Sequence, residues 1–185
     1  MYEIEFVGRG GQGAKTAAEI VARQAIKKGF FVQSFPDYGP ERKGAPVRAF
    51  TRLSLTPIRG CSSEANPNII VVIDPTLLSL NKIFFNLTEK TILLANTAKS
   101  PEELKSELSI NCKIYTIDAT SIALKYLKSA ITNTTMLGAL AKISDHYTIE
   151  ELKKEIEEEF GRKLTSEKLQ ANILAAEEAY AQVKG

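Results

Sequence analysis

Residues 2–23 read YEIEFVGRGGQGAKTAAEIVAR, and this stretch decides the class of fold. Apolar and charged residues alternate through Tyr2–Val7, which predicts a β-strand. A glycine-rich loop follows, and Ala14–Arg23 is typical of a helix. In this context small residues let the backbone approach an anion, while N–H groups at the helix start point towards it. We therefore predict a cofactor-binding loop made of Gly8, Arg9, Gly10, Gly11, Gln12 and Gly13, with Lys15 adding positive charge.

A nicotinamide dinucleotide site is an alternative interpretation of this loop. Phe30–Phe35 predicts a second strand, and Asp37 follows Gly13 at about the distance of a ribose-binding acid. However, Pro36 and the residues after it stand where a dinucleotide fold would begin its second helix. Nothing from Asp37 to Arg48 has helical periodicity, so this alternative is the weaker one.

A second loop, residues 38–47 (YGPERKGAPV), is equally informative. Its glycines and prolines exclude an ordinary helix or central strand and impose a bent backbone path. Three charged residues lie inside that path. We predict a rigid loop that presents charge to a partner or to an active site, against the alternative of a solvated surface loop. The residues concerned are Tyr38, Gly39, Pro40, Glu41, Arg42, Lys43 and Gly44.

Together the two loops resemble those of the gamma subunit of 2-oxoacid:ferredoxin oxidoreductases, in the pyruvate (pyruvate synthase) and 2-oxoisovalerate branch. The resemblance rests on residues 8–14, 33–36 and 38–50 and continues through residues 66–74 and 76–78. It spans essentially the whole chain. One departure is Lys43, where family members often carry an arginine. Lysine keeps the charge but loses the planar fork that binds carboxylates in a bidentate way.

The resemblance implies a subunit of an enzyme that oxidatively decarboxylates a 2-oxoacid to an acyl-coenzyme A. Thiamine diphosphate, Mg²⁺ and iron–sulfur clusters would lie in partner alpha, beta and delta subunits, with coenzyme A as cosubstrate and ferredoxin as electron acceptor. The chain has no Gly-Asp-Gly segment of the kind that thiamine enzymes use. Its two cysteines, Cys61 and Cys112, cannot supply a four-thiolate cluster. We expect no catalytic or metal-binding residue here, and an inactive isolated chain.

The rest of the sequence predicts one α/β domain over residues 1–185, a three-layer α/β/α sandwich with a mostly parallel, mixed sheet. Further strands are expected at Val47–Leu53, near Pro57–Gly60, and at Ile69–Ile73, Thr91–Ala95 and Lys113–Ile117. The polar residues of Val47–Leu53 indicate an edge or antiparallel strand. A helical C-terminal segment follows, with Asp118 as a cap, a capping box at Thr148 and Glu151, and a last helix over about Ser166–Val183. That helix packs either on this chain's own core or on a partner.

Composition excludes several classes of function. The formal net charge is only +2, so neither a nucleic-acid nor a membrane surface is indicated. No apolar run approaches membrane-spanning length, and few cysteines fit a reducing cytoplasm. The single histidine, His146, has no partners at metal-ligand spacing and is expected to be a structural or surface residue.

Two individual roles have alternatives that the sequence leaves open. Arg9 either orients an anion or pairs with a partner carboxylate, or is simply a surface arginine beside a turn. Gln12 either donates to a phosphate or carboxylate, or closes the loop on itself. Three classes of function remain: a required non-catalytic subunit, a free-standing dinucleotide enzyme, and a scaffold domain.

Overall fold

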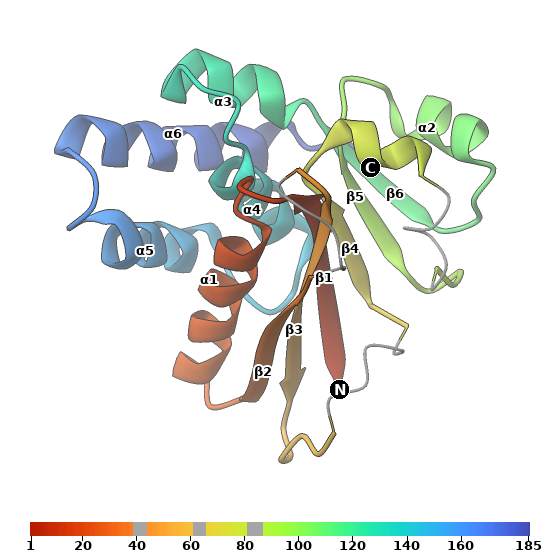
Figure 1. Cartoon of the computed structure of the whole chain (residues 1–185), viewed down its shortest axis with the longest axis horizontal. Coiled ribbons are helices and arrows are strands. Elements are labelled where there is room, and N and C mark those ends of the chain that lie inside the picture. The colour runs from red at the N-terminus through yellow and green to blue at the C-terminus, as the bar shows by residue number, and fades with distance from the viewer. Residues whose placement is uncertain (39–43, 61–65, 81–86) are drawn as a thin grey trace.

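A six-stranded mixed sheet forms the centre of the computed structural model, which describes residues 1–38, 44–60, 66–80 and 87–185 (Figure 1). Its strands are β1 (Tyr2–Arg9), β2 (Phe31–Tyr38), β3 (Pro46–Ser54), β4 (Ile69–Val72), β5 (Ile92–Asn96) and β6 (Lys113–Ile117). They lie in the order β2-β3-β1-β4-β5-β6. The glycine loop, residues 8–13, therefore leaves a strand in the interior of the sheet.

The sheet changes from parallel to antiparallel at β1. Strands β1, β4, β5 and β6 run parallel, whereas β3 pairs antiparallel with both β1 and β2. The predicted antiparallel direction of Val47–Leu53 is confirmed, and β2 rather than β3 occupies the sheet edge. Strands β2 and β3 form a hairpin. The loop between them therefore lies at the carboxyl end of β1, which is also where the glycine loop begins (Figure 1).

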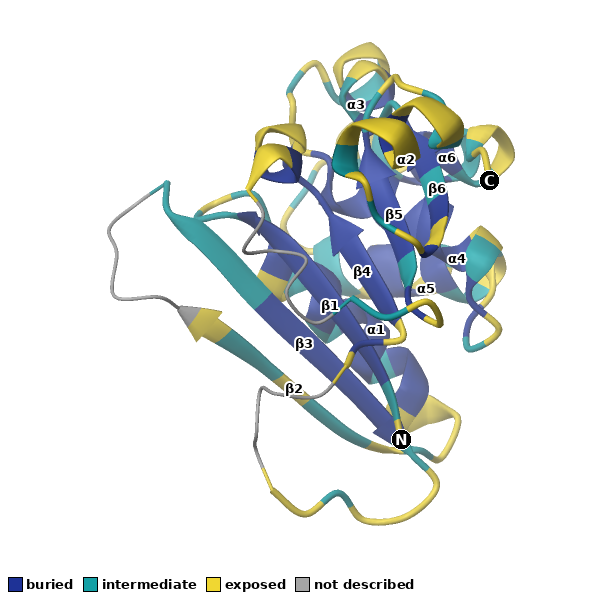
Figure 2. Cartoon of the chain, turned by 90° about the vertical axis from the view of Figure 1, so that its right-hand side faces the viewer, coloured by how far each residue is buried: buried dark blue, intermediate teal, exposed yellow. Residues whose placement is uncertain are grey.

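Helices cover both faces of the sheet. One face carries α1 (Ala14–Lys27), α3 (Ala119–Leu127), α4 (Asn133–Ile143), α5 (Ile149–Phe160) and α6 (Ser166–Gln182). The other carries α2 (Pro101–Leu108) and the short 3-10 helix η1 (Pro75–Ser79). Figure 2 shows β1 and β4 as part of a buried layer between them, whereas the edge strand β2 is only partly covered. The predicted three-layer α/β/α arrangement, with a mostly parallel, mixed sheet and a helical C-terminal segment, is confirmed.

N-terminal capping residues mark where several of the helices begin. Asp118 accepts a hydrogen bond from Ser121 N at 2.9 Å, and Thr148 forms the predicted capping box with Glu151. The last helix packs on this chain's own core, since α6 lies so close to α4 that a Cβ on Gly138 would fall 2.0 Å from the Ala176 carbonyl oxygen. Sequence reasoning missed α2, which Ser100 begins with a capping box of its own.

The strand predicted near Pro57–Gly60 is wrong. Residues 57–60 have no regular structure, and Gly60 has a φ of +101° that lies outside the strand region. Pro57 also lacks the N–H that a ladder would need.

The charged residues of β1 are buried rather than solvated. Glu5 receives a bidentate ion pair from Arg48 of β3, at 2.5 and 2.8 Å, and Glu3 pairs across the same strands through its Oε2 with Arg52 Nε. Both glutamates are almost fully buried. The alternation in Tyr2–Val7 therefore identifies the strand, but both of its faces lie inside the molecule.

The two edges of the sheet carry distinctive residues. Pro36 lies within the edge strand β2, and Lys184 forms an isolated antiparallel bridge with Thr116 on the outer side of β6. None of the helices in the described ranges combines the length and hydrophobicity that crossing a bilayer would require.

Candidate functional site

The glycine loop leaves the start of α1 without a cap. Gly11 and Gly13 have φ values of +96° and +83°, a region that favours glycine. Gly13 is the N-cap residue, so no side-chain oxygen caps the helix, and the first turn has no acidic residue. The free N–H groups and the helix dipole together make this end electropositive. The local geometry is suited to receiving an anion.

Gln12 combines the two roles that the sequence left open. Its Oε1 accepts a hydrogen bond from Arg9 N at 2.6 Å, which closes the loop on itself. Its Nε2 donates to Asp74 Oδ2, also at 2.6 Å, so the carboxylate it binds belongs to this chain. Gln12 thus fixes the loop against the carboxyl end of β4.

Asp74 is the residue on which these contacts converge. It follows β4 and caps η1, accepting from both the backbone N and the Oγ1 of Thr76 at 2.8 and 2.6 Å. The Arg9 guanidinium lies 3.3 Å from its second oxygen. Burial alone would raise the pKa of Asp74, but the hydrogen bonds from Thr76 and Gln12 and the charge of Arg9 outweigh it, and the pKa is lowered.

Arg9 joins the glycine loop to the second loop. Its Nη1 donates to the Gly44 carbonyl oxygen at 3.0 Å, and its Nε and Nη2 donate to Thr76 Oγ1 at 3.2 and 2.9 Å. Beside it, Gly10 N donates to the Ala45 carbonyl oxygen at 3.1 Å. The guanidinium is therefore used within this chain, and the two loops that the sequence singled out form one hydrogen-bonded unit.

The described part of the second loop is its two ends. Tyr38 pairs with Val47 at the end of the hairpin, and Gly44 has a φ of +93°. The remaining residues predicted for this loop, Gly39, Pro40, Glu41, Arg42 and Lys43, lie outside the described residues, as does Cys61.

Lys15 follows the glycine loop, in the first turn of α1, and its ammonium group is only weakly paired. Its ammonium lies 3.5 Å from Glu19 one turn along α1, and both side chains are about half exposed, so the pair is weak. Lys15 can therefore contribute charge to a ligand at the helix start.

A residue that the sequence analysis did not single out also reaches this loop. Asn133, the first residue of α4, lies so close to Gly13 that a Cβ on the glycine would be 2.5 Å from the asparagine amide nitrogen. The run Thr132–Thr135 is polar yet buried. In the sequence, a polar run before an apolar helix indicates an ordinary helix cap, so Asn133 did not stand out as a site residue. Asp74 was missed as a site residue for a similar reason, although an acid at the carboxyl end of a parallel strand is a usable signal.

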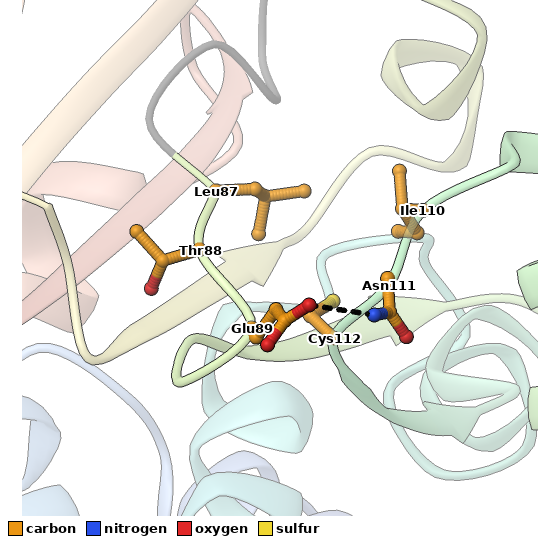
Figure 3. A pocket seen from close by; sticks show the side chains of 6 residues that line it. All are labelled: Leu87, Thr88, Glu89, Ile110, Asn111 and Cys112. Carbon is orange, nitrogen blue, oxygen red and sulfur yellow. Dashed lines mark hydrogen bonds between the residues drawn. The ribbon is translucent and has the colours of Figure 1, made fainter.

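Cavities are also found away from the glycine loop. One of about 370 Å³ is bounded by Leu87, Thr88, Glu89, Ile110, Asn111 and Cys112 (Figure 3). Asn111 Nδ2 donates to Glu89 Oε1 at 2.9 Å across it. It lies at the amino ends of β5 and β6, away from the glycine loop, and burial raises the pKa of the Cys112 thiol. This cavity is not part of the candidate site.

The dinucleotide alternative does not fit the topology. Such a fold needs a helix between β2 and a parallel third strand, whereas β2 turns directly into the antiparallel β3. Within the described ranges no three His, Cys, Asp or Glu side chains gather as metal ligands would. The His146 ring centroid lies 4.2 Å from that of Tyr2 and 5.8 Å from that of Phe30, so this side chain packs against two aromatic rings.

Comparisons with known proteins identify the family of this chain. The family model described as pyruvate ferredoxin/flavodoxin oxidoreductase matches residues 3–182. Pyruvate synthase subunit PorC of Thermotoga maritima is 45% identical over 183 residues, covering 99% of this chain and 95% of the relative. The pyruvate/ketoisovalerate oxidoreductases common subunit gamma of Thermococcus kodakarensis is 46% identical over 181 residues, covering 97% and 96%.

A solved structure shows the same fold. The crystal structure of the Thermotoga maritima pyruvate oxidoreductase subunit PORC superposes with a TM-score of 0.85 at 43% identity, covering 99% of this chain and 97% of that one. The match extends over nearly all of each chain. The chain described here belongs to the pyruvate ferredoxin/flavodoxin oxidoreductase family.

Proposed function

We propose that this chain is the gamma subunit of a 2-oxoacid:ferredoxin oxidoreductase that converts pyruvate, or a branched 2-oxoacid, to the acyl-coenzyme A. The proposal is supported by the relatives, which are named as subunits of pyruvate and ketoisovalerate oxidoreductases. In this proposal the alpha, beta and delta subunits of a cytoplasmic complex hold thiamine diphosphate, Mg²⁺ and the iron–sulfur clusters. Ferredoxin accepts the electrons. The gamma chain itself forms a single domain over residues 1–185.

The chain's own contribution is the unit formed by its two loops. The observation that carries this is Arg9, which binds Asp74 and Thr76 on one side and the Gly44 carbonyl on the other. Because the second loop is tied to the glycine loop, movement of one is transmitted to the other. The electropositive start of α1 binds a phosphate of coenzyme A, while residues 38–44 face a partner subunit and its active site.

Substitution of Gln12 in the assembled complex tests this role. Gln12→Ala removes the bonds to Arg9 N and to Asp74, so the loop loses its closed shape. We expect normal assembly, a KM for coenzyme A raised about tenfold, and a KM for the 2-oxoacid that changes little. Gln170→Ala, at an exposed position of α6, is the matched control.

Each contrary result has a distinct meaning. If the Gln12→Ala complex assembles and keeps its turnover and both KM values, the loops have no role in coenzyme A binding. If the variant fails to assemble, the chain acts as a scaffold. Oxygen-free purification of the tagged chain from its host identifies its partners by mass. An assay of the eluate for coenzyme A-dependent oxidation of different 2-oxoacids then shows which one the complex uses.

A further inference from the structure

The chain leaves the sheet at Ile73, between the end of β4 and the short helix η1. The parallel ladder between β4 and β5 ends with the pair Val72 and Ala95, whereas β5 itself continues to Asn96. The Ile73 N–H still donates to the Val7 carbonyl oxygen at 2.8 Å. Its own carbonyl lies beyond the end of the ladder. Because Ile73 is only 2% exposed, that carbonyl needs a donor from elsewhere in the fold.

A side-chain amide supplies that donor. Asn96 Nδ2 donates to the Ile73 carbonyl oxygen at 2.8 Å and to Thr120 Oγ1 at 3.0 Å, and its Oδ1 accepts from Thr120 N at 3.2 Å. Asn96 is 1% exposed and ends the otherwise apolar strand β5. Burying an amide is unfavourable unless it is hydrogen-bonded, so an asparagine at this position depends on these contacts. The Asn96 amide thus takes the place of the next ladder bond and connects the end of β4 to the start of α3.

The Ile73 carbonyl and the Asp74 nitrogen belong to one planar peptide group. A hydrogen bond to that carbonyl therefore fixes the plane from which Asp74 begins. The Asp74 carboxylate lies 2.6 Å from Gln12 Nε2 and 3.3 Å from Arg9 Nε. Such contacts weaken steeply when their geometry changes, so a small rotation of this peptide would disturb both of them. A single peptide thus separates Asn96 from the carboxylate on which the candidate site depends.

We propose that Asn96 is a positioning residue, whose amide holds the peptide after Ile73 so that the Asp74 carboxylate reaches the glycine loop. Asn96 acts through Asp74 and is not itself a contact residue, since it is almost completely buried. The geometric part of the inference is independent of any ligand, whereas its expected effect on coenzyme A rests on the proposed function. The simpler alternative is that Asn96 only fastens the start of α3 through Thr120.

Asn96→Leu in the full 185-residue chain tests the contact, because leucine has a similar volume but neither donates nor accepts a hydrogen bond. The quantity measured is the pKa of the Asp74 carboxylate in the folded chain, followed by ¹³C NMR. In the original chain this pKa lies below its ordinary value of 3.8. We expect it to rise in the variant, because the contacts of Asp74 with Gln12 and Arg9 are weakened.

Hydrogen exchange gives a second readout of the same change. The Arg9 backbone N–H donates to Gln12 Oε1 at 2.6 Å. In the Asn96→Leu chain this N–H should exchange about tenfold faster relative to that of Val71 within β4, which reports only on global opening. Asn96→Ser is smaller and removes the same amide donor, so it gives both readouts if the leucine chain does not fold.

Two control variants separate positioning from a loss of stability. Thr91→Val removes a buried hydroxyl that donates to the Pro67 carbonyl oxygen at 3.0 Å, at the opposite end of β5. Thr120→Val removes the hydroxyl that Asn96 contacts in α3 but keeps the backbone N–H that donates to it. Both variants should lower the melting temperature and leave the pKa of Asp74 unchanged.

An Asn96→Leu chain that keeps both the Asp74 pKa and the relative Arg9 exchange rate of the original overturns the inference. A Thr120→Val chain that shifts the Asp74 pKa equally also overturns it, because fastening of α3 would then be the cause. In the assembled complex, Asn96→Leu should raise the KM for coenzyme A about fivefold with little change in kcat. If the Asp74 pKa rises but neither Asn96→Leu nor Gln12→Ala changes that KM, the proposed function fails and the positioning role stands. If Gln12→Ala raises the KM while Asn96→Leu changes neither quantity, only the positioning role fails.

Discussion

Gln12 and Asp74, 62 residues apart in the chain, are joined by a hydrogen bond of 2.6 Å between the Gln12 amide nitrogen and the Asp74 carboxylate. This contact ties the loop after β1 to the end of β4, the two neighbouring parallel strands at the centre of the sheet. Asp74 also pairs with Arg9, and Arg9 donates a hydrogen bond to the Gly44 carbonyl oxygen. Asp74 is therefore connected through Arg9 to the second loop. The shape of the candidate site therefore depends on one carboxylate.

Asp74→Asn should destabilise the chain by about 1–3 kcal/mol near neutral pH, because three donors lose a charged acceptor. The folded-state pKa of Asp74 lies below its ordinary value of 3.8. Its contribution is therefore fully present above that value and is lost as the pH falls through the lower folded-state pKa. Urea unfolding of both proteins from about pH 6 to pH 3 should show the difference shrinking in acid.

Asp118→Asn is the control for that comparison, because asparagine caps a helix about as well as aspartate does. A pH-independent difference between the Asp74→Asn chain and the original would mean that the carboxylate's charge is not what holds the loops.

Gly13→Ala should cost clearly more stability than Gly29→Ala. Both glycines have a φ of +83°, at the two ends of α1, so the backbone penalty of about 1–2 kcal/mol is common to both. Only at Gly13 would the new Cβ meet Asn133, whereas at Gly29 nothing lies within 4 Å. Thermal unfolding measures the two costs. The excess at Gly13 should fall in an Asn133→Ala background, and an excess that persists there would show that Asn133 is not the obstacle.

Gly138→Ala should separate α4 from α6. The added Cβ would lie 2.0 Å from the Ala176 carbonyl oxygen. Neither a Cβ nor a backbone carbonyl can relieve this clash by a change of rotamer. Overpacking of this kind costs about 1–3 kcal/mol or more. Denaturant unfolding checks it, with Gln170→Ala on the exposed side of α6 as a control. A neutral result would mean that the two helices shift apart without loss of packing.

Arg48→Met should be among the most damaging substitutions in the sheet, because it leaves Glu5 buried without its cation. Removing one partner of a buried ion pair costs about 3–5 kcal/mol. Burial already raises the pKa of Glu5 despite the hydrogen bond and charge of Arg48, and loss of Arg48 raises it further. A raised folded-state pKa means that stability is lost as the pH rises, so the penalty should diminish at acid pH.

Lys99→Met is the matched control for Arg48→Met. Lys99 pairs with Glu107 at the surface, where both side chains are about half exposed, so its loss should cost within about 1 kcal/mol. Equal penalties for the two variants, measured by urea unfolding, would contradict the importance given to burial.

Sequence alone predicted those elements whose signals are local. The strand, glycine loop and helix of residues 2–23 were recognisable because the periodicity changes there, and the caps at Asp118 and Thr148 were equally visible. The same kind of signal, Ser100 with Glu103, marks α2 but was overlooked. The strand expected near Pro57–Gly60 had only short apolar character, and its proline and glycine decided against it.

The site could be predicted only in outline, because its contacts are long-range. That Arg9 and Gln12 matter was inferred from their place beside glycines, but their partners Asp74 and Gly44 lie tens of residues away. Asn133 reaches Gly13 from a different helix altogether. Nothing in the local pattern of residues 132–135 distinguishes such a contact from an ordinary helix start.

The outer margins of the sheet have a consequence for how the chain behaves in concentrated solution. An open strand edge can recruit a strand from another molecule and begin aggregation. Pro36 removes a donor from the β2 margin, and Lys184 occupies part of the β6 margin through its two backbone bonds with Thr116. Both margins are thereby poor templates for further strands, which helps to keep neighbouring molecules from joining sheet to sheet.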